Sequence, residues 1–296
     1  MKGPKKLLEK KWFSTLLWVV LLIILWEIGA VVVSQTKRTP ENILPHIYQI
    51  IAAAFSRKPV ANGMTASQVV WTSAGMTLAR AAYGFIIGTL LGFVLALLMK
   101  WSCIVEKTVF PYLMLIQMIP ILGMAPIILA ITGDINTSRV AIAAILTFYP
   151  VATNTLAGFQ SVSREKYELM SSYAANKYTL YTKVLIPSSI PYFFTGLKIS
   201  APMAITASIL VDTLQGDGGL GCMLSQSLKH AMSIYVFWLI VFFSAFIGIF
   251  SSRLMGLIEL LATPQKRHLV KNFFQPKKRK GEQELCLKEE KVYGRG

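Results

Sequence analysis

The chain has 296 residues, of which 54% are hydrophobic and only 15% are charged, and its mean hydropathy is positive. Several apolar runs approach the ~20 residues that a helix needs to cross a bilayer, so we expect an integral membrane protein. The formal net charge of +16 does not indicate a nucleic-acid partner, because the Lys and Arg residues lie mostly between and beyond the apolar runs rather than on one soluble domain.

Catalytic and metal chemistry also lack support in the sequence. The three Cys and three His residues are widely spaced, with no Cys-x-x-Cys pair and no neighbouring set of metal ligands. A membrane-embedded enzyme would need His, Asp or Cys residues clustered at one depth, and the sequence has no such cluster. We therefore expect no metal site, no cofactor and no catalytic residue.

The first apolar run covers residues 12–34 and follows a basic segment, residues 1–11. The run is longer than about 20 residues and ends without a small-x-small cleavage site, which favours a retained transmembrane helix over a signal peptide. The loop that follows, residues 35–77, contains ILPHIYQIIAAAFSRK. Its apolar stripe predicts a helix that lies on the membrane surface or on the other spans.

Five further apolar runs complete an all-α, polytopic fold with six transmembrane helices. They cover residues 78–99, 109–131, 138–158, 190–214 and 234–258.

The distribution of Lys and Arg predicts the orientation. Basic residues concentrate in residues 1–11, in the loop at 160–189 and in the charged tail, residues 263–296. Short cytoplasmic loops carry the excess of positive charge, so both termini and the 160–189 loop are expected in the cytoplasm. The tail has the composition of a disordered segment, and solvation is favoured over contact of its basic part with membrane lipid.

Small residues predict how the spans pack. Gly84, Gly88 and Gly92 are each four apart, which places three notches on one helix face and favours a helix-packing seam. Proline predicts where helices bend or break, because it removes a backbone donor. We expect the third span to be broken at Pro111, Pro120 and Pro126, and the fifth at Pro202.

Two acidic residues lie within or at the rim of spans on the external side, Glu27 and Asp212. A carboxylate at a membrane span is costly unless it meets water or a partner. Ser208, Asp212 and Gln215 follow one drifting face of the fifth span, where helix packing and lining of a solute pathway remain equally open. Together with Pro120 they are the candidate pathway or gate residues. Glu27 also has an alternative, a simple position at the membrane interface.

The stretch ELMSSYAANKYTLYTKVLIP, residues 168–187, is polar and lies between two apolar runs. It predicts two short helices around a turn at residues 174–176, with the second helix ending at Pro187. A pair of short helices outside the membrane is more than a connection requires, which indicates a docking element.

The spacing in this stretch resembles the EAA loop of binding-protein-dependent ABC importer permeases. That loop has Glu, two small residues, three more, Gly, nine more, and then an aliphatic, any residue, an aliphatic and Pro. The corresponding positions are Glu168, Ala174, Val184, Ile186 and Pro187. The small pair is Leu169-Met170 here, and Ala replaces the Gly, so we expect Ala175 and Asn176 to supply the turn.

Other segments are similar to the nitrate, sulfonate and taurine branch of that superfamily. They include LW-E in the first span, NILP before the external helix, the prolines and Gly133 of the third span, FYPVATNTLAGFQSV in the fourth, and GGLG after Asp212. The resemblance is collinear over roughly residues 20–262.

The resemblance implies a non-catalytic permease subunit in the plasma membrane of a prokaryote, with a core at 78–262 and a coupling loop at 160–189. Its partners would be a second permease copy or homologue, a cytoplasmic ABC ATPase dimer and an extracytoplasmic substrate-binding protein. Leu169, Met170 and Tyr173 would contact the ATPase, and Glu168 would cap or pair locally. The solute would be a sulfonate, nitrate or a pyrimidine-type vitamin precursor.

An ion-coupled secondary transporter or channel is the alternative interpretation. It predicts inverted repeats and several membrane-embedded ionisable groups. The sequence has no evident inverted repeat, and two acidic residues near the outer face give this alternative little support.

Overall fold

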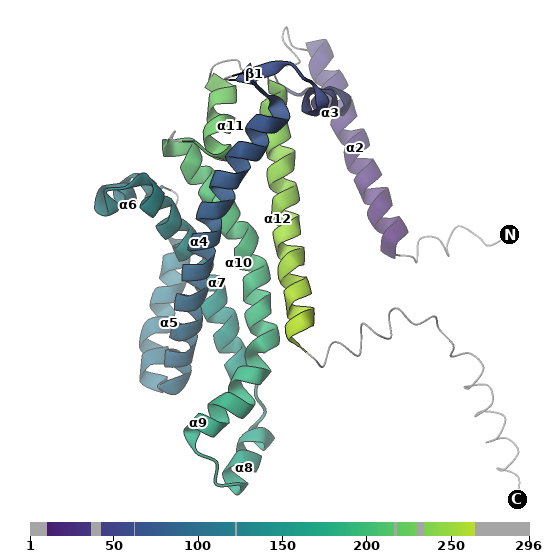
Figure 1. Ribbon diagram of the computed structural model, residues 1–296. Coiled ribbons are helices and arrows are strands. Elements are labelled where there is room, and N and C mark those ends of the chain that lie inside the picture. Colours follow the sequence, from purple (N-terminus) through teal and green to yellow (C-terminus); the bar gives the residue numbers. More distant parts are fainter. Residues whose placement is uncertain are drawn as a thin grey trace, which may run out of the picture.

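The computed structural model describes residues 11–36, 43–61, 63–121, 123–215, 218–229 and 234–263. Figure 1 shows long helices that run side by side, with α8 and α9 at one end and α3, β1 and α11 at the other. We call these the loop end and the opposite end. Residues 1–10 of the predicted basic segment, 1–11, and nearly all of the predicted tail, 263–296, lie outside the described residues.

The described elements are almost all helical. In chain order they are α2 (Lys11–Thr36), α3 (Ile47–Phe55), β1 (Pro59–Ala61), β2 (Met64–Thr65), α4 (Ala66–Trp101), α5 (Cys103–Met118), α6 (Ala125–Thr132), α7 (Ile135–Gln160), α8 (Arg164–Ser172), α9 (Lys177–Leu180), the π-helical turn η2 (Tyr181–Leu185), α10 (Ile186–Gln215), α11 (Leu220–Lys229) and α12 (Ile234–Ala262).

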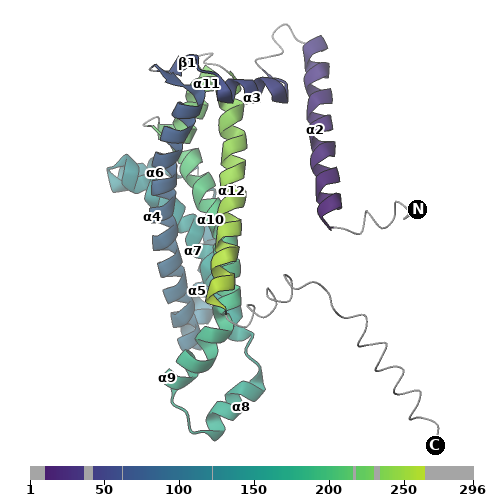
Figure 2. The same ribbon diagram turned by 45° about the vertical axis from the view of Figure 1, so that its right-hand side comes forward.

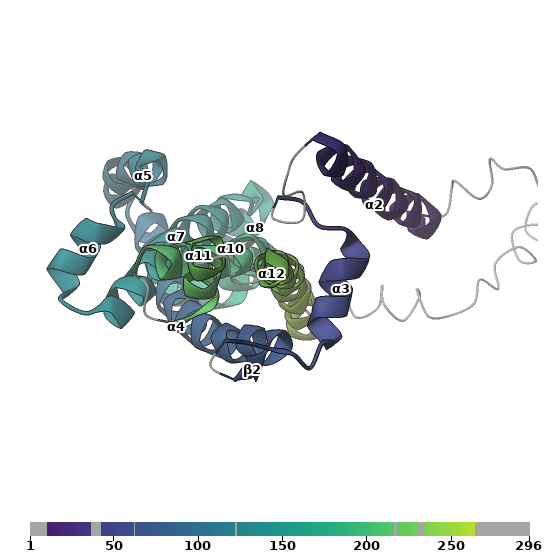
Figure 3. The ribbon, with the colours of Figure 1, turned by 90° about the horizontal axis from the view of Figure 1, so that it is seen from above.

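Five described helical segments are long and apolar enough to cross a bilayer. The predicted third span, 109–131, is two helices, α5 and α6, in the described part of the chain, so the predicted count of six spans is not confirmed. The break falls between Met118 and Ala125 and includes Pro120, as expected, whereas Pro111 lies inside α5 and does not interrupt it. Seen from above, α5 and α6 lie on one side of the bundle and α2 on the other (Figure 3).

The core of the bundle is formed where α7 packs between α4 and α10. A methyl group on Gly84 would lie 2.5 Å from Cβ of Ala143, and one on Gly88 would lie 2.4 Å from the carbonyl oxygen of Ala144. Both contacts are too close for any side chain, so the two backbones meet directly at these positions. The glycines of α4 therefore form the predicted packing seam, and its partner is α7.

The helix after the loop is longer and more continuous than predicted. Pro187 does not end the second loop helix, because α9 leads through η2 directly into α10. The wider π-helical turn accommodates a proline that would otherwise clash with a carbonyl one turn back. Pro202 does not break α10 either. The hydroxyl of Thr206 donates to the Pro202 carbonyl at 3.0 Å, a bond that bends a helix without interrupting it.

The opposite end contains structure that the sequence did not predict. A short antiparallel pair, β1 and β2, precedes α4, which begins at Ala66 rather than at residue 78. The side chain of Thr65 accepts from the Gln68 backbone and caps this helix. The predicted segment 35–77 contains a helix, α3, and the GGLG segment after Asp212 leads directly into α11.

Helix α2 stands beside the bundle, and α3 lies between α2 and α12 at the opposite end (Figure 2). The Trp26 indole of α2 donates to the Pro45 carbonyl at 3.1 Å, and the Trp26 ring packs edge-on against Trp238 of α12. The carboxylate of Glu27 accepts from the backbone N–H of Ile47 at 3.0 Å and lies 2.7 Å from His46 Nδ1. Glu27 thereby holds the first turn of α3 against α2.

Candidate functional site

The predicted coupling loop forms a helical hairpin, which we call the loop hairpin (residues 164–185). Its two arms are α8 and the α9–η2 segment, and Figure 2 shows them projecting beyond the long helices. Ala174 lies between them with φ of 50°, and among the described residues it is the one non-glycine with positive φ. Ala174 itself therefore makes the left-handed turn where the family pattern has Gly. Asn176 has a different role, since its side chain accepts from the Thr179 backbone and caps α9.

The base of the loop hairpin is fixed in the apolar core. Leu185 is buried against a cluster that includes Met99 of α4, Leu113 of α5 and Phe159 of α7. The two motif aliphatics, Val184 and Ile186, pack against the same cluster. The base of the loop hairpin is thus packed against three other long elements as well as being continuous with α10.

The tip of the loop hairpin is exposed. Leu169, Tyr173 and Tyr178 are 56%, 76% and 75% exposed, while Met170 is half-buried. Glu168 accepts from Arg164 Nε at 2.9 Å within α8, and both side chains are exposed. Glu168 therefore pairs locally, and the exposed apolar groups are those of Leu169 and the two tyrosines. Large apolar groups that project from the end of a bundle are typical of an interaction site.

The opposite end holds a buried ionic cluster around Asp212, which we call the aspartate cluster (Thr77, Arg80, Arg139 and Asp212). Oδ1 of Asp212 lies 2.9 Å from Arg139 Nε and 3.3 Å from Arg80 Nη1. Oδ2 accepts from the hydroxyl of Thr77 at 2.7 Å. The side chains of Asp212 and Arg139 are fully buried. A carboxylate with these three partners joins α10 to α4 and α7.

The aspartate cluster also fixes the start of α11. The backbone N–H of Leu220 donates to Thr77 Oγ1 at 2.9 Å. A methyl group on Gly219, where φ is 96°, would lie 2.2 Å from Asp212 Oδ2, and one on Gly221 would lie 1.9 Å from the Ile209 carbonyl oxygen. The GGLG segment is glycine-rich because its backbone lies directly on Asp212 and on α10.

The candidate pathway residues do not form one group in the structure. Ser208 and Asp212 are completely buried within the subunit, and the Ser208 hydroxyl donates to the Thr77 carbonyl at 3.2 Å. Pro120 is exposed at the break between α5 and α6, and Gln215 is the last residue of α10. Asp212 was identified from the sequence, but its partners Arg80 and Arg139 were not. Both arginines lie inside apolar spans, and a basic residue in such a position indicates a buried ionic partner.

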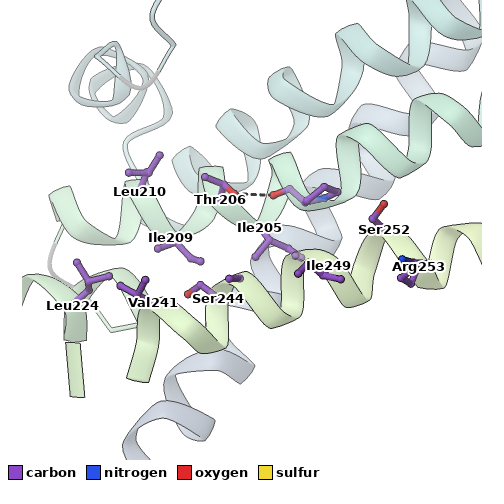
Figure 4. A pocket seen from close by; sticks show the side chains of 13 residues that line it. Ile205, Thr206, Ile209, Leu210, Leu224, Val241, Ser244, Ile249, Ser252 and Arg253 are labelled. Carbon is purple, nitrogen blue, oxygen red and sulfur yellow. Dashed lines mark hydrogen bonds between the residues drawn. The ribbon is translucent and has the colours of Figure 1, made fainter. Parts of the chain in front are cut away.

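A second ion pair joins α10 and α12 nearer the loop end, where Lys198 Nζ bonds to the carboxylate of Glu259. Beside it a groove of about 690 Å³ runs between these two helices. Figure 4 shows apolar side chains facing each other across it, with Leu224 at one end and Arg253 at the other.

The fold and these sites define a polytopic α-helical membrane subunit with a projecting helical hairpin. The chain belongs to the family of binding-protein-dependent transport system inner membrane components, whose model matches residues 88–261. It is therefore a non-catalytic, multi-pass permease subunit of an ABC importer in the plasma membrane, and it works with an ATPase and a substrate-binding protein.

Two curated relatives show the likeness in sequence. The formylaminopyrimidine transport permease protein ThiX of Halalkalibacterium halodurans is 32% identical over 205 residues, which cover 69% of this chain and 77% of ThiX. The nitrate import permease protein NrtB of Synechococcus elongatus is 22% identical over 272 residues, which cover 90% of this chain and 94% of NrtB.

A solved structure shows the same fold at low sequence identity. The crystal structure of an amino acid ABC transporter with histidines has a chain that superposes with a TM-score of 0.57 at 22% identity. The match covers 65% of this chain and 94% of that one.

Proposed function

We propose that the loop hairpin is the surface through which an ABC ATPase drives this permease. The observation that carries the proposal is a tip with exposed Leu169, Tyr173 and Tyr178 on a base whose Leu185 is 1% exposed. An exposed apolar tip provides binding energy, and an anchored base transmits force. The spacing shared with the EAA loop supports the same assignment.

The loop end then faces the cytoplasm. The excess of Lys and Arg in the segments beside it supports this orientation, because short cytoplasmic loops carry that excess. Both chain termini would lie on the same side. The β1–β2 pair, α3 and α11 would face the substrate-binding protein.

Movement of the loop hairpin reaches the opposite end through α10. This helix begins immediately after η2 and extends to Gln215, with the aspartate cluster near its far end. Closure of two ATPase subunits would tip α10 as a rigid body, and two permease subunits moving together would alternate the opening of the central pathway. In this proposal Asp212 and Ser208 act as gate residues by fixing the far end of α10, and Pro120, which is exposed, lines the pathway between two copies.

The solute is a small organic or inorganic molecule delivered by the binding protein. The names of the two relatives, a formylaminopyrimidine permease and a nitrate permease, support this range. The permease partner is either a second copy of this chain or a homologous permease.

Co-purification tests the docking assignment. The full chain carrying Leu169→Asp and Tyr173→Asp is co-expressed with its ABC ATPase, and the ATPase retained on the tagged permease is measured. We expect the retained ATPase to fall at least about tenfold, since charges replace buried apolar contacts at the centre of the interface.

The matched control is Tyr48→Asp on α3, where the tyrosine is 66% exposed at the opposite end. The control should retain the ATPase at the wild-type level. Equal retention by the double variant and by wild type would show that the ATPase binds elsewhere.

A further inference from the structure

The groove between α10 and α12 has apolar walls and one charged end. Figure 4 shows that the walls are aliphatic over most of their length. Their members are Ile205, Ile209, Leu210, Leu224, Val241 and Ile249. The hydroxyls of Thr206 and Ser244 donate to carbonyls of their own helices, at 3.0 Å to Pro202 and 2.7 Å to Ile240. These hydroxyls are already satisfied, so the walls present an apolar surface to an occupant.

A single cation marks the loop end of the groove. Arg253 and Ser252 line it there, and Arg253 is exposed. Within the described part of the chain, no carboxylate forms an ion pair with Arg253, and Glu259 of the same helix bonds to Lys198. An anion bound at this end of the groove would therefore neutralise the positive charge of Arg253.

The position of Arg253 along α12 corresponds to the boundary of the hydrocarbon core. Arg253 follows Ile234, the first residue of α12, by 19 residues. This separation corresponds to about 28 Å at the rise of an α-helix, close to the ~30 Å thickness of the hydrocarbon core. Trp101, which is 65% exposed at the loop end of α4, is the kind of residue that marks this interface. The guanidinium therefore lies near the depth of phospholipid headgroups.

The length of the groove matches one leaflet. Val241 and Arg253 are 12 residues apart on α12. The corresponding distance is about 18 Å, slightly more than the ~15 Å depth of one leaflet's hydrocarbon.

We propose that this groove is a binding site for an anionic phospholipid, with one acyl chain between α10 and α12 and the phosphate at Arg253. A small hydrophilic anion would leave the aliphatic walls uncovered, and a zwitterionic lipid would bring a second cation to Arg253 together with its phosphate. A phospholipid with net negative charge provides the apolar chain and the anion in one molecule, and the bilayer supplies it at this depth. A groove that holds an acyl chain needs no other charged side chain, and Arg253 is the one charged residue among the described residues that line it.

The test uses the purified full chain in mild detergent, with phosphatidylglycerol and phosphatidylcholine of identical acyl chains added in separate titrations. Bound lipid is counted by native mass spectrometry, and the melting temperature is followed in parallel. We expect wild type to bind phosphatidylglycerol about fivefold more tightly than phosphatidylcholine, the preference one basic residue near a membrane surface provides. Arg253→Gln should reduce that ratio to near one, and Arg253→Lys should keep most of it.

Two further variants separate the chain from the headgroup. Ala245→Phe places a ring in the groove without touching Arg253, and it should weaken the binding of both lipids. Lys107→Gln removes an exposed cation of α5 and should leave the binding of both lipids at the wild-type level.

Three results would overturn the proposal. Arg253→Gln could keep the full preference for phosphatidylglycerol, which would place the anion site elsewhere. Glycerol phosphate alone could raise the melting temperature as much as the lipid, which would indicate a site for a soluble anion. Ala245→Phe could dissociate a dimer, which would make the groove a contact between two copies.

Discussion

The two ends of the bundle are held together by different physical means. At the opposite end, Asp212 joins three long helices through buried polar contacts, and Gly219 lies directly on its carboxylate. At the loop end, the base is held by apolar packing around Leu185, and the tip carries exposed apolar groups and one exposed ion pair. Buried ionic contacts fix one geometry, because any displacement leaves a charge without a partner. The opposite end is thus built to hold its arrangement, and the loop end is built to bind.

The largest effect is expected from Asp212→Asn. The side chain keeps its shape, but the buried guanidinium of Arg139 and the partly buried one of Arg80 lose their carboxylate. Breaking a buried pair costs roughly 3–5 kcal/mol. The melting temperature of the detergent-purified chain should fall by many degrees. Glu168→Gln, which breaks the exposed pair with Arg164, should change stability by less than about 1 kcal/mol. Equal effects of the two substitutions would remove the distinction between the two ends.

A smaller loss is expected when a methyl group is added to the helix seam. Gly88→Ala places Cβ 2.4 Å from the Ala144 carbonyl oxygen and should destabilise the chain by about 1–3 kcal/mol. Gly75→Ala is the matched control on the same helix, because nothing lies within 4 Å of its added methyl group. The control should be neutral or raise the melting temperature, since Ala favours a helix over Gly. A stable Gly88→Ala variant would contradict direct contact between α4 and α7.

The smallest effect is expected at the turn of the loop hairpin. Ala174 has φ of 50°, which an L-residue adopts at a cost of roughly 1–2 kcal/mol and glycine adopts freely. Ala174→Gly should therefore slightly protect the loop hairpin from limited proteolysis, and Ala174→Val should expose it. If both variants were cut like wild type, the turn would not depend on this residue.

The sequence predicted the loop end better than the opposite end. Spacing between Glu168 and Pro187 was enough to locate two short helices, because turn and helix signals are local. The spacing did not predict that the helix continues through Pro187 into α10, because this continuation depends on the wider π-helical turn η2. The partners of Asp212 lie 132 and 73 positions away in sequence, at Arg80 and Arg139. Such pairing is set by how α4, α7 and α10 pack, which residue spacing does not contain.

The length of the spans was also only partly predictable. Apolar runs marked the helices that meet lipid, but α4 extends to Ala66 through a polar first turn that Thr65 caps. The predicted third span is not a single helix, because Pro120 and Gly123 interrupt an otherwise apolar run. Hydropathy measures transfer into lipid and is insensitive to such a break.

Site-specific cross-linking tests the docking role of the loop end most directly. With Cys103, Cys222 and Cys286 all replaced by Ser, single cysteines are introduced as Tyr173→Cys on the loop hairpin and Tyr48→Cys on α3. The permease is then treated with a short thiol–amine cross-linker in membranes containing its ABC ATPase. Tyr173→Cys should form a permease–ATPase product, and Tyr48→Cys should not. A product from Tyr48→Cys with none from Tyr173→Cys would contradict the assignment of the loop hairpin as the ATPase-binding surface.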